Sequence, residues 1–235
     1  FARLHTARWL RGLMPVVVIP LVTTLLVGSI MYMLLGRPLE ALMHNLDHGL
    51  KSMSEGGGSV FLGIILGLMM CFDLGGPINK SAYLFATAGL AAESTASYEI
   101  MAAVMAAGMV PPLALALATA VRPRLFTSGE QENGRAAWLL GASFISEGAI
   151  PFAAAAPLRI IPATMVGGAV TGALTMLLHV GSRAPHGGIF VAFAIDGFAK
   201  FALAILAGMA VTAALVILLK SLNREKSPGK VQAAA

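Results

Sequence analysis

The sequence predicts an all-α membrane protein that crosses the bilayer several times, and three observations lead to this class. Charged residues make up only 11% of the chain and apolar residues 57%, against roughly 25% charged residues in a soluble domain. Long charge-free stretches reach the about 20 residues that a spanning helix needs. Basic residues lie at the ends of these stretches, where membrane proteins keep them. These observations exclude a soluble globular domain, a disordered chain and a nucleic-acid-binding protein, despite the formal net charge of +5.

Charge-free windows predict about five spanning helices. The windows cover residues 12–36, 56–72, 100–121, 160–182 and 201–219. The second window has 17 residues and is marginal by itself. Shorter apolar stretches lie at residues 81–92, 136–146, 148–158 and 184–195. Because 11 or 12 residues are too few to cross, these stretches predict broken helices and two re-entrant hairpins, over 136–158 and 184–195.

The placement of basic residues predicts the orientation of the chain. Residues 1–11 and 122–135 contain three arginines each, and four more basic residues follow position 219. Because cytoplasmic loops are rich in Lys and Arg, we expect these segments and both termini to be cytoplasmic. Acidic residues outnumber basic ones in residues 37–55, which are expected outside. We predict one membrane domain over residues 1–226 and a disordered tail over 227–235.

A first polar cluster, at residues 73–80, interrupts apolar sequence. Its Gly-Gly-Pro segment ends a helix, since glycine frees the backbone and proline lacks a donor. Asn79 can both donate and accept hydrogen bonds, which suits sugar hydroxyls. We expect Asp73 and Lys80 to neutralise each other. The alternative interpretation is an interfacial loop between two spans.

A second cluster surrounds Glu147. No other charged residue lies between Arg135 and Arg159, and an isolated carboxylate in apolar surroundings is costly unless it is paired or protonated. Gly148 and Pro151 break the helix beside it, which predicts a hairpin tip. We interpret Glu147 as a functional residue. The alternative is a structural ion pair with Arg159.

Two further polar positions have both a functional and a structural interpretation. Arg159 directly precedes the 160–182 window. We interpret it as a structural counter-charge or as a residue that extends its charge toward the membrane surface. His186 lies at a Pro/Gly break between apolar stretches. A lone histidine is more often structural than a ligand, but this setting favours a functional role.

The remaining signals are weaker. Asp196 and Lys200 are spaced to pair on one helix face. The spacing of His44, Asp47 and His48 fits a metal site, but a solvated surface explains it better, and we predict no metal and no cofactor. His179 has no evident partner, and Cys71 is expected to be a small buried apolar residue. Glycines at positions 63, 67, 167, 168 and 172 allow close helix approach.

Four motifs together resemble a known family. GGPINK at 75–80, SEGAIPF at 146–152, PLRIIP at 157–162 and APHGG at 184–188 are similar to the fructose-type IIC domain of the bacterial phosphoenolpyruvate-dependent sugar phosphotransferase system. The similarity runs from about Leu13 to Leu219. It implies that the chain is the later part of such a domain and lacks its first spans.

The resemblance also implies a function. IIC domains of this type are homodimeric inner-membrane permeases that hold a sugar between broken helices. In this family, the phosphate for the sugar comes from separate IIA and IIB domains through a phosphohistidine and a phosphocysteine. Cys71 does not resemble the IIB cysteine, so this chain would carry no phosphoryl group itself. By motif, Glu147 would bind sugar hydroxyls and orient the one that accepts phosphate. The other substrate-binding positions implied are Asn79, His186, Gly75, Gly76, Ser146 and Gly187.

One departure from the family pattern concerns Arg159. Family members usually have an acidic residue just before the PLR segment, where this chain has Ala156. Glu147 or Asp196 would then have to pair with Arg159 instead. The open alternatives are a proton-coupled transporter with Glu147 as its titrating group and a non-functional membrane subunit or fragment. Fructose is the expected sugar, with mannose-type sugars and polyols as alternatives.

Overall fold

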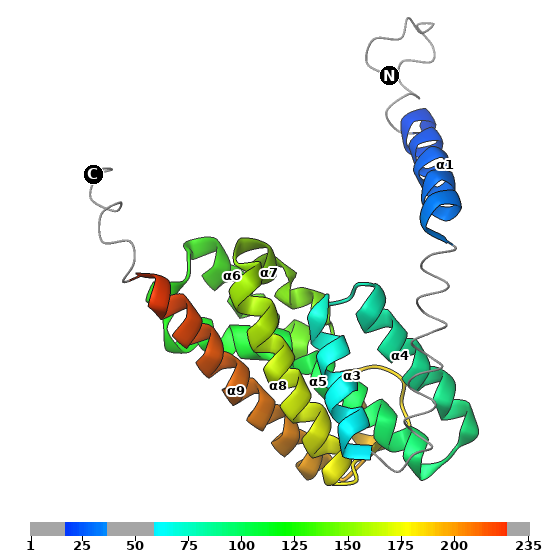
Figure 1. The fold of residues 1–235 in the computed structure, drawn as a ribbon, viewed down its shortest axis with the longest axis vertical. Coiled ribbons are helices and arrows are strands. Elements are labelled where there is room, and N and C mark those ends of the chain that lie inside the picture. Colours follow the sequence, from blue (N-terminus) through cyan, green and yellow to red (C-terminus); the bar gives the residue numbers. More distant parts are fainter. Residues whose placement is uncertain (1–16, 37–58, 225–235) are drawn as a thin grey trace, which may run out of the picture. The chain divides into compact units, whose positions relative to one another are not determined.

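The computed structural model describes residues 17–36 and 59–224, which belong to two separate compact units. In the first unit, helix α1 (Ile19–Met31) continues into a π-helical turn, η2 (Tyr32–Gly36). Pro20 lies at the start of α1, where its missing N–H is not needed. The second unit contains every other described element (Figure 1).

The second unit is built almost entirely from helices. Its longer elements are α3 (Ser59–Phe72), α4 (Pro77–Gly89), α5 (Thr95–Val121), α6 (Ser128–Ala142), α7 (Ile150–Ala155), α8 (Pro157–Leu177) and α9 (Phe198–Arg224). Short 3-10 turns are η3 (Leu90–Ala92), η4 (Pro123–Leu125), η5 (Ser146–Ala149) and η6 (Gly188–Ala194). Strands β1 (Gly181–Ser182) and β2 (Ile195–Asp196) form an antiparallel pair that sets Gly181 opposite Asp196. The predicted all-α class is confirmed, with this ribbon as its only described sheet.

Helix α5 forms the core of the second unit. Residues 101–107 are fully buried, and α5 contacts α3, α6, α8 and α9. Ser94 and Ser97 form a reciprocal capping box at its N-terminus, which satisfies backbone donors that a helix start leaves unpaired. A helix that is apolar on all sides lies in a protein core or in lipid, and α5 is surrounded by other helices.

Helices α3, α8 and α9 lie side by side and approach closely through glycines (Figure 1). A Cβ atom added to Gly67 would lie 2.1 Å from the Gly168 carbonyl oxygen, and one added to Gly63 would lie 2.4 Å from that of Gly172. Gly167 faces Thr212 of α9 in the same way. Small residues let backbones approach and make dispersion contacts. The expected close helix approach is thus confirmed.

Three described helices are long and apolar enough to cross a membrane: α5, α8 and α9. They correspond to the predicted windows 100–121, 160–182 and 201–219. The windows 12–36 and 56–72 contain shorter apolar helices, over Ile19–Leu34 and Ser59–Phe72. Helix α8 ends at Leu177, whereas the predicted window extends to residue 182. Residues 178–180 form a turn that leads to β1.

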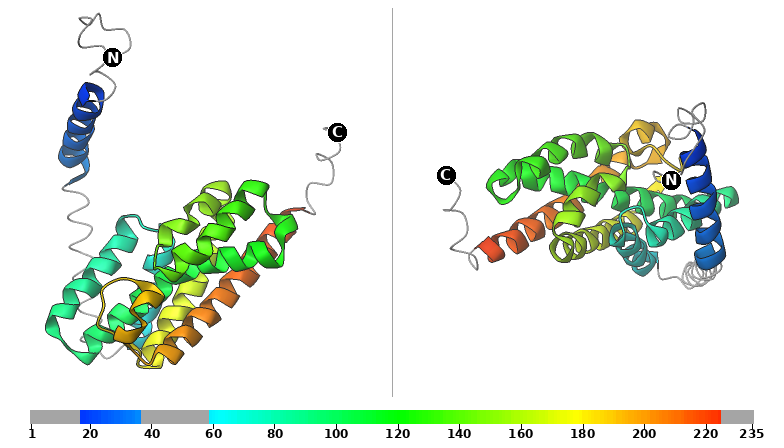
Figure 2. Two further views of the ribbon diagram at one scale, coloured as in Figure 1. Left: turned by 180° about the vertical axis from the view of Figure 1, so that it is seen from behind. Right: turned by 90° about the horizontal axis from the view of Figure 1, so that it is seen from above.

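The chain is interrupted where glycine and proline predicted breaks. Residues 73–76 separate α3 from α4, residues 143–149 separate α6 from α7, and residues 178–197 connect α8 to α9 without a long helix. In the view from behind (Figure 2, left), the gold segment that contains η6 lies against α5. These interruptions bring backbone and polar side chains into the interior of the helical unit. Their predicted arrangement as membrane re-entrant hairpins remains a prediction.

Candidate functional site

Asp73 organises the break between α3 and α4. Its carboxylate accepts hydrogen bonds from the backbone N–H groups of Ile78, at 2.7 Å, and Asn79, at 2.9 Å. These donors are among those that a helix N-terminus leaves without intrahelical partners. The expected neutralisation of Asp73 by Lys80 is therefore wrong. Asp73 faces the backbone at the start of α4, whereas Lys80 extends to a different segment.

Glycines make this break possible. Gly75 has a φ of +113°, which glycine adopts at little cost. A Cβ atom at this position would lie 2.5 Å from Oε1 of Glu147. A Cβ atom at Gly76 would lie 2.5 Å from Oδ2 of Asp73. The glycines therefore give room to two carboxylates and let the broken backbone approach Glu147.

Asn79 is buried at the first turn of α4, with 2% of its surface exposed. Its side-chain Nδ2 donates a hydrogen bond of 2.6 Å to the carbonyl oxygen of Met70 in α3. That bond satisfies a carbonyl near the end of α3 and joins the two helices across the break. Asn79 also lines the pocket described below.

Glu147 lies in η5 and forms an ion pair with Lys80. The Lys80 Nζ and Glu147 Oε1 atoms are 3.1 Å apart, and both side chains are about half exposed. Ser146 beside it is buried and donates a 2.9 Å hydrogen bond to the Gly108 carbonyl oxygen of α5. The η5 turn is thus fixed to the core helix through Ser146, while Glu147 points away from it toward α4.

His186 comes from the third interrupted segment. The centroid of its ring lies 4.9 Å from that of the Phe144 ring. It lies 6.1 Å from the centroid of the Tyr83 ring, which it meets edge-on. Gly187 follows with a φ of +123°, and a Cβ atom at Gly188 would lie 2.1 Å from the Ala142 carbonyl oxygen. These glycines allow the His186 loop to contact the turn between α6 and η5.

Phe144 connects these segments and adopts a φ of +64°, which is uncommon for a residue with a side chain. Its ring is buried over Gly108, where a Cβ atom would lie 2.3 Å from the ring. Left-handed conformations of this kind cost free energy and occur mainly where the surrounding structure enforces them. Here the contacts with α5 and His186 hold the turn.

The three interrupted segments enclose a small pocket of about 90 Å³. Its lining combines a carboxylate, an ammonium group, an amide, a hydroxyl, an imidazole and aromatic rings. The residues are Met70, Asn79, Lys80, Tyr83, Phe144, Ile145, Ser146, Glu147 and His186. A few convergent polar groups beside aromatic surface are typical of small-molecule sites.

The structure thus brings four of the predicted binding residues to one pocket and leaves three beside it. Asn79, Ser146, Glu147 and His186 line the pocket. Gly75 and Gly187 adjoin Glu147 and His186, and Gly76 adjoins Asp73. Lys80, which the sequence indicated only as a structural charge, is also part of the lining. The binding role of these residues remains a prediction.

The sequence analysis missed Tyr83, Phe144 and Met70 as pocket residues. Tyr83 follows Asn79 by four positions and Lys80 by three, a spacing that places all three on adjoining parts of one helix face. That spacing could have identified Tyr83. For Phe144 no comparable signal exists, because its position depends on contacts with α5 and His186.

Arg159 lies in the first turn of α8, and no ion pair or hydrogen bond of its side chain is found within residues 17–36 and 59–224. Neither of the two expected substitutes pairs with it. Glu147 pairs with Lys80, and Asp196 pairs with Arg183 at 2.9 Å. The absence of an acidic residue at Ala156 is therefore not compensated by either carboxylate.

Two further pairing expectations are wrong. Asp196 does not pair with Lys200, because Asp196 belongs to β2 and Gly197, with a φ of +78°, separates it from α9. Lys200 instead donates to the Leu178 carbonyl oxygen. His179, expected to lack a partner, lies 2.9 Å from Glu99 through its Nδ1 atom.

Cys71 is not among the residues that line this pocket. Cys71 is fully buried, as expected, with its Sγ 3.5 Å from the Ala107 carbonyl oxygen. Among the described residues, no group of three or more His, Cys, Asp or Glu side chains could hold a metal ion. His44, Asp47 and His48 lie outside the described residues.

Apolar helices of spanning length, three interrupted segments and a polar pocket lined by those segments are the features of a polytopic membrane protein. A family model described as "Phosphotransferase system, EIIC" matches residues 10–167. This chain belongs to that family.

Curated relatives extend the similarity over most of the chain. A "PTS system fructose-specific EIIB'BC component" of Escherichia coli (strain K12) is 48% identical over 214 residues, which cover 90% of this chain and 37% of the relative. The protein of the same name from Rhodobacter capsulatus is 51% identical, with 91% and 37% covered. A "Fructose permease IIC component" of Bacillus amyloliquefaciens is 43% identical, with 92% and 70% covered. The chain thus spans little more than a third of the length of the first two. No solved structure matches it.

Proposed function

We propose that this chain is the membrane-embedded part of a sugar permease of the phosphotransferase system, and that its sugar is fructose. The observation that carries the proposal is the Lys80–Glu147 contact in the wall of the pocket, where α4 and η5 meet. The names of the relatives, which describe fructose-specific components and a fructose permease, support the same sugar.

The pocket residues have the chemistry that a sugar requires. The Glu147 carboxylate accepts hydrogen bonds from sugar hydroxyls, and bonds to a charged group are stronger than neutral ones. Asn79, Ser146 and His186 supply further polar groups around the sugar. Phe144 and Tyr83 offer aromatic surface to the C–H faces of the ring. Gly75, Gly76 and Gly187 let the backbone segments approach the sugar.

The size of the pocket indicates that it opens when the sugar enters. Its volume of about 90 Å³ is smaller than the roughly 300–1,000 Å³ of small-molecule sites. The Lys80–Glu147 contact is half exposed, and a sugar hydroxyl can take the place of either partner. We infer that sugar entry separates these two side chains.

Phosphorylation would take place on the bound sugar. A IIB domain or protein carrying a phosphocysteine would donate the phosphoryl group. A sugar hydroxyl oriented by Glu147 would attack the phosphorus as the bond to sulfur breaks, its proton would pass to the Glu147 carboxylate, and the cysteine would leave as a thiolate. Positioning and electrostatic stabilisation account for most of the catalysis in such transfers. The chain itself would carry no phosphoryl group and no cofactor.

The proposal includes the setting of the protein. It acts as a homodimer in the bacterial inner membrane, with both ends of this chain on the cytoplasmic side. The arginines of residues 122–135 and the basic residues after position 219 support that orientation. A cytoplasmic IIB partner would then reach the same side.

The test is phosphotransfer in membrane vesicles that contain this chain. Labelled fructose, mannose or mannitol is supplied with phosphorylated IIB, and the sugar phosphate is measured. The proposal expects fructose phosphate that requires IIB. Uptake driven by a proton gradient without IIB would instead indicate a proton-coupled transporter. If the chain shows no sugar binding and no sugar uptake, the result would indicate a non-functional subunit.

A further inference from the structure

A second and larger pocket lies away from the sugar site, at the end of α5. Its volume is about 530 Å³, and α5, η4 and α9 form its walls. Gly108, which binds Ser146 beside the sugar pocket, precedes Val121 by thirteen residues. At 1.5 Å per residue this is about 20 Å along the helix, so the two pockets are separate sites.

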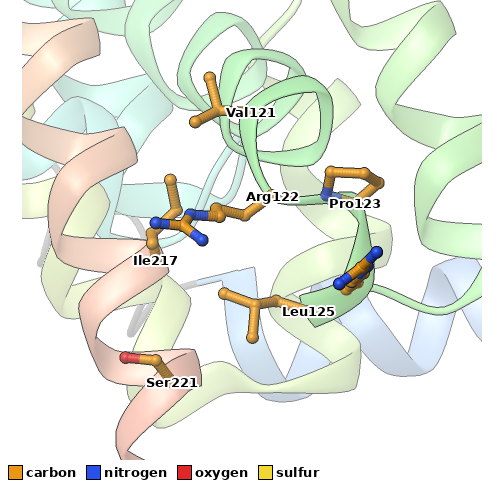
Figure 3. Close-up of a pocket in the computed structure, with 7 residues that line it drawn as sticks. Val121, Arg122, Pro123, Leu125, Ile217 and Ser221 are labelled. Carbon is orange, nitrogen blue, oxygen red and sulfur yellow. The ribbon is translucent and has the colours of Figure 1, made fainter.

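The lining of this second pocket is apolar on one side and basic on the other. Val121, Leu125 and Ile217 supply the apolar surface, and Arg122 and Arg124 the positive charge. The Arg122 side chain extends toward Ile217 of α9 (Figure 3). An apolar cleft with a guanidinium at its rim matches a molecule that is apolar along its length and anionic at one end.

One acidic residue of this region, Glu130, already has a basic partner. Glu130 forms a buried ion pair with Lys220, with both side chains less than 10% exposed. Its carboxylate is therefore engaged before any ligand arrives. Within the described chain, the Arg122 side chain makes no ion pair or hydrogen bond. The Arg122 guanidinium at the rim of the pocket can therefore meet an anionic group.

The position of the pocket is that of a membrane–water interface. It lies where two helices of spanning length, α5 and α9, approach their C-terminal ends. A neighbouring hollow that shares Pro123 is lined by Arg135 and Trp138, and the Trp138 side chain is exposed. Tryptophan and arginine gather at the level of lipid head groups.

We propose that this pocket binds one anionic phospholipid. The Arg122 guanidinium holds the phosphodiester of the head group, and an acyl chain lies against Val121, Leu125 and Ile217. Basic pockets between membrane helices bind anionic head groups in this way. Neither the sugar nor the phosphoryl donor takes part, so the proposal stands independently of the proposed function.

The test is native mass spectrometry of the purified chain in mild detergent. Dioleoylphosphatidylglycerol and dioleoylphosphatidylcholine are added in turn, because they differ only in head group. We expect the anionic lipid to bind about fivefold more tightly, the effect of one cationic contact near the surface. Arg122→Gln should remove this preference. Arg135→Gln, which removes a charge outside the pocket, should leave it.

A second variant tests the apolar part of the pocket. Ile217→Trp fills the cleft without changing charge and should reduce retention of phosphatidylglycerol; if Arg122→Gln fails to fold, this variant decides. Equal binding of both lipids by the unsubstituted chain would overturn the proposal, as would equal losses in the two arginine variants. So would displacement of the lipid by an equal concentration of inorganic phosphate, which would indicate a simple anion site.

Another outcome would assign the pocket to a protein partner. If Arg122→Gln keeps the preference for phosphatidylglycerol but lowers phosphotransfer from IIB, the pocket serves docking of that partner and the lipid proposal is wrong.

Discussion

Lys80 and Glu147 are 67 positions apart in the sequence, yet their side chains meet at 3.1 Å. Lys80 follows the break at residues 73–76, and Glu147 lies within the break at residues 143–149. Their contact joins two interrupted segments at the wall of the pocket. The breaks therefore do more than end helices, because they bring opposite charges from distant parts of the chain to one place.

Replacing Glu147 by Gln should weaken sugar binding. The amide keeps the size of the side chain but loses the charge that strengthens hydrogen bonds to sugar hydroxyls. A hydrogen bond to a charged group contributes about 1.5–3 kcal/mol, so we expect the dissociation constant to rise by about 10- to 100-fold. Isothermal titration of fructose measures this change. Glu132→Gln, on an exposed part of α6, is the control, and normal affinity in Glu147→Gln would refute the site.

The Lys80–Glu147 pair should contribute little to stability. Its side chains are 51% and 44% exposed, and exposed pairs contribute about 0–1 kcal/mol. A double-mutant cycle with Lys80→Gln and Glu147→Gln, followed by thermal unfolding in detergent, should give a coupling energy below about 1 kcal/mol. The same cycle on the buried pair Glu130–Lys220 should give a larger value. A coupling of equal size in both cycles would make Lys80–Glu147 a structural clamp.

Gly67→Ala should destabilise the contact between α3 and α8. The new Cβ would lie 2.1 Å from the Gly168 carbonyl oxygen, and backbone atoms cannot yield as a flexible side chain does. Overpacking of this kind costs about 1–3 kcal/mol of unfolding free energy. Chemical unfolding in detergent micelles measures the loss. Gly129→Ala is the matched control, because its Cβ would meet nothing within 4 Å; equal stability of the two variants would contradict this packing.

The Glu130–Lys220 pair should make stability depend on pH in the acid range. Burial by itself raises the pKa of Glu130, but hydrogen bonds from Lys220 and Thr127 and the Lys220 charge outweigh it and lower this pKa below 4.5. Because the pKa is lower in the folded state, the stabilisation is complete above pH 4.5. It is lost as pH falls through the folded-state pKa.

Glu130→Gln provides the measurement. Breaking a buried pair leaves Lys220 without its partner, which costs about 3 kcal/mol or more at neutral pH. The variant should unfold at a lower temperature at pH 7, and its stability should change less than that of the unsubstituted chain between pH 5 and about pH 3. Glu132→Gln should follow the unsubstituted chain. Parallel pH profiles for Glu130→Gln and the unsubstituted chain would contradict the role of this pair.

Ala156→Asp should stabilise the protein. Ala156 is the N-cap of α8 and makes no side-chain cap, and Asp at an N-cap in place of Ala contributes about 0.5–2 kcal/mol. The new carboxylate also lies three positions before Arg159, which has no ion pair within the described chain. Thermal unfolding should show a higher midpoint for Ala156→Asp than for Ala154→Asp, inside α7. A lower midpoint would mean that Arg159 already has a stabilising environment.

Local patterns were sufficient to predict the long apolar helices and where the chain breaks, but not the start of α6 at Ser128, in a polar segment. Apolar windows located α5, α8 and α9, and the Gly-Gly-Pro segment located the end of α3. Both signals depend on residues that are neighbours in the sequence, through the length of an apolar run and the conformational limits of glycine and proline. The sequence also indicated Glu147 as unusual, because an isolated carboxylate in apolar sequence is costly.

The partners of charged residues could not be predicted in this way. The sequence predicted the pairs Asp73–Lys80 and Asp196–Lys200. In the folded chain Lys80 instead contacts Glu147, and Asp196 contacts Arg183. Coulomb attraction does not depend on sequence separation, so a pair forms wherever the fold brings two charges together. For this reason the sequence alone determined the membrane class, the long apolar helices and the breaks, and only the tertiary structure decided which side chains share the pocket.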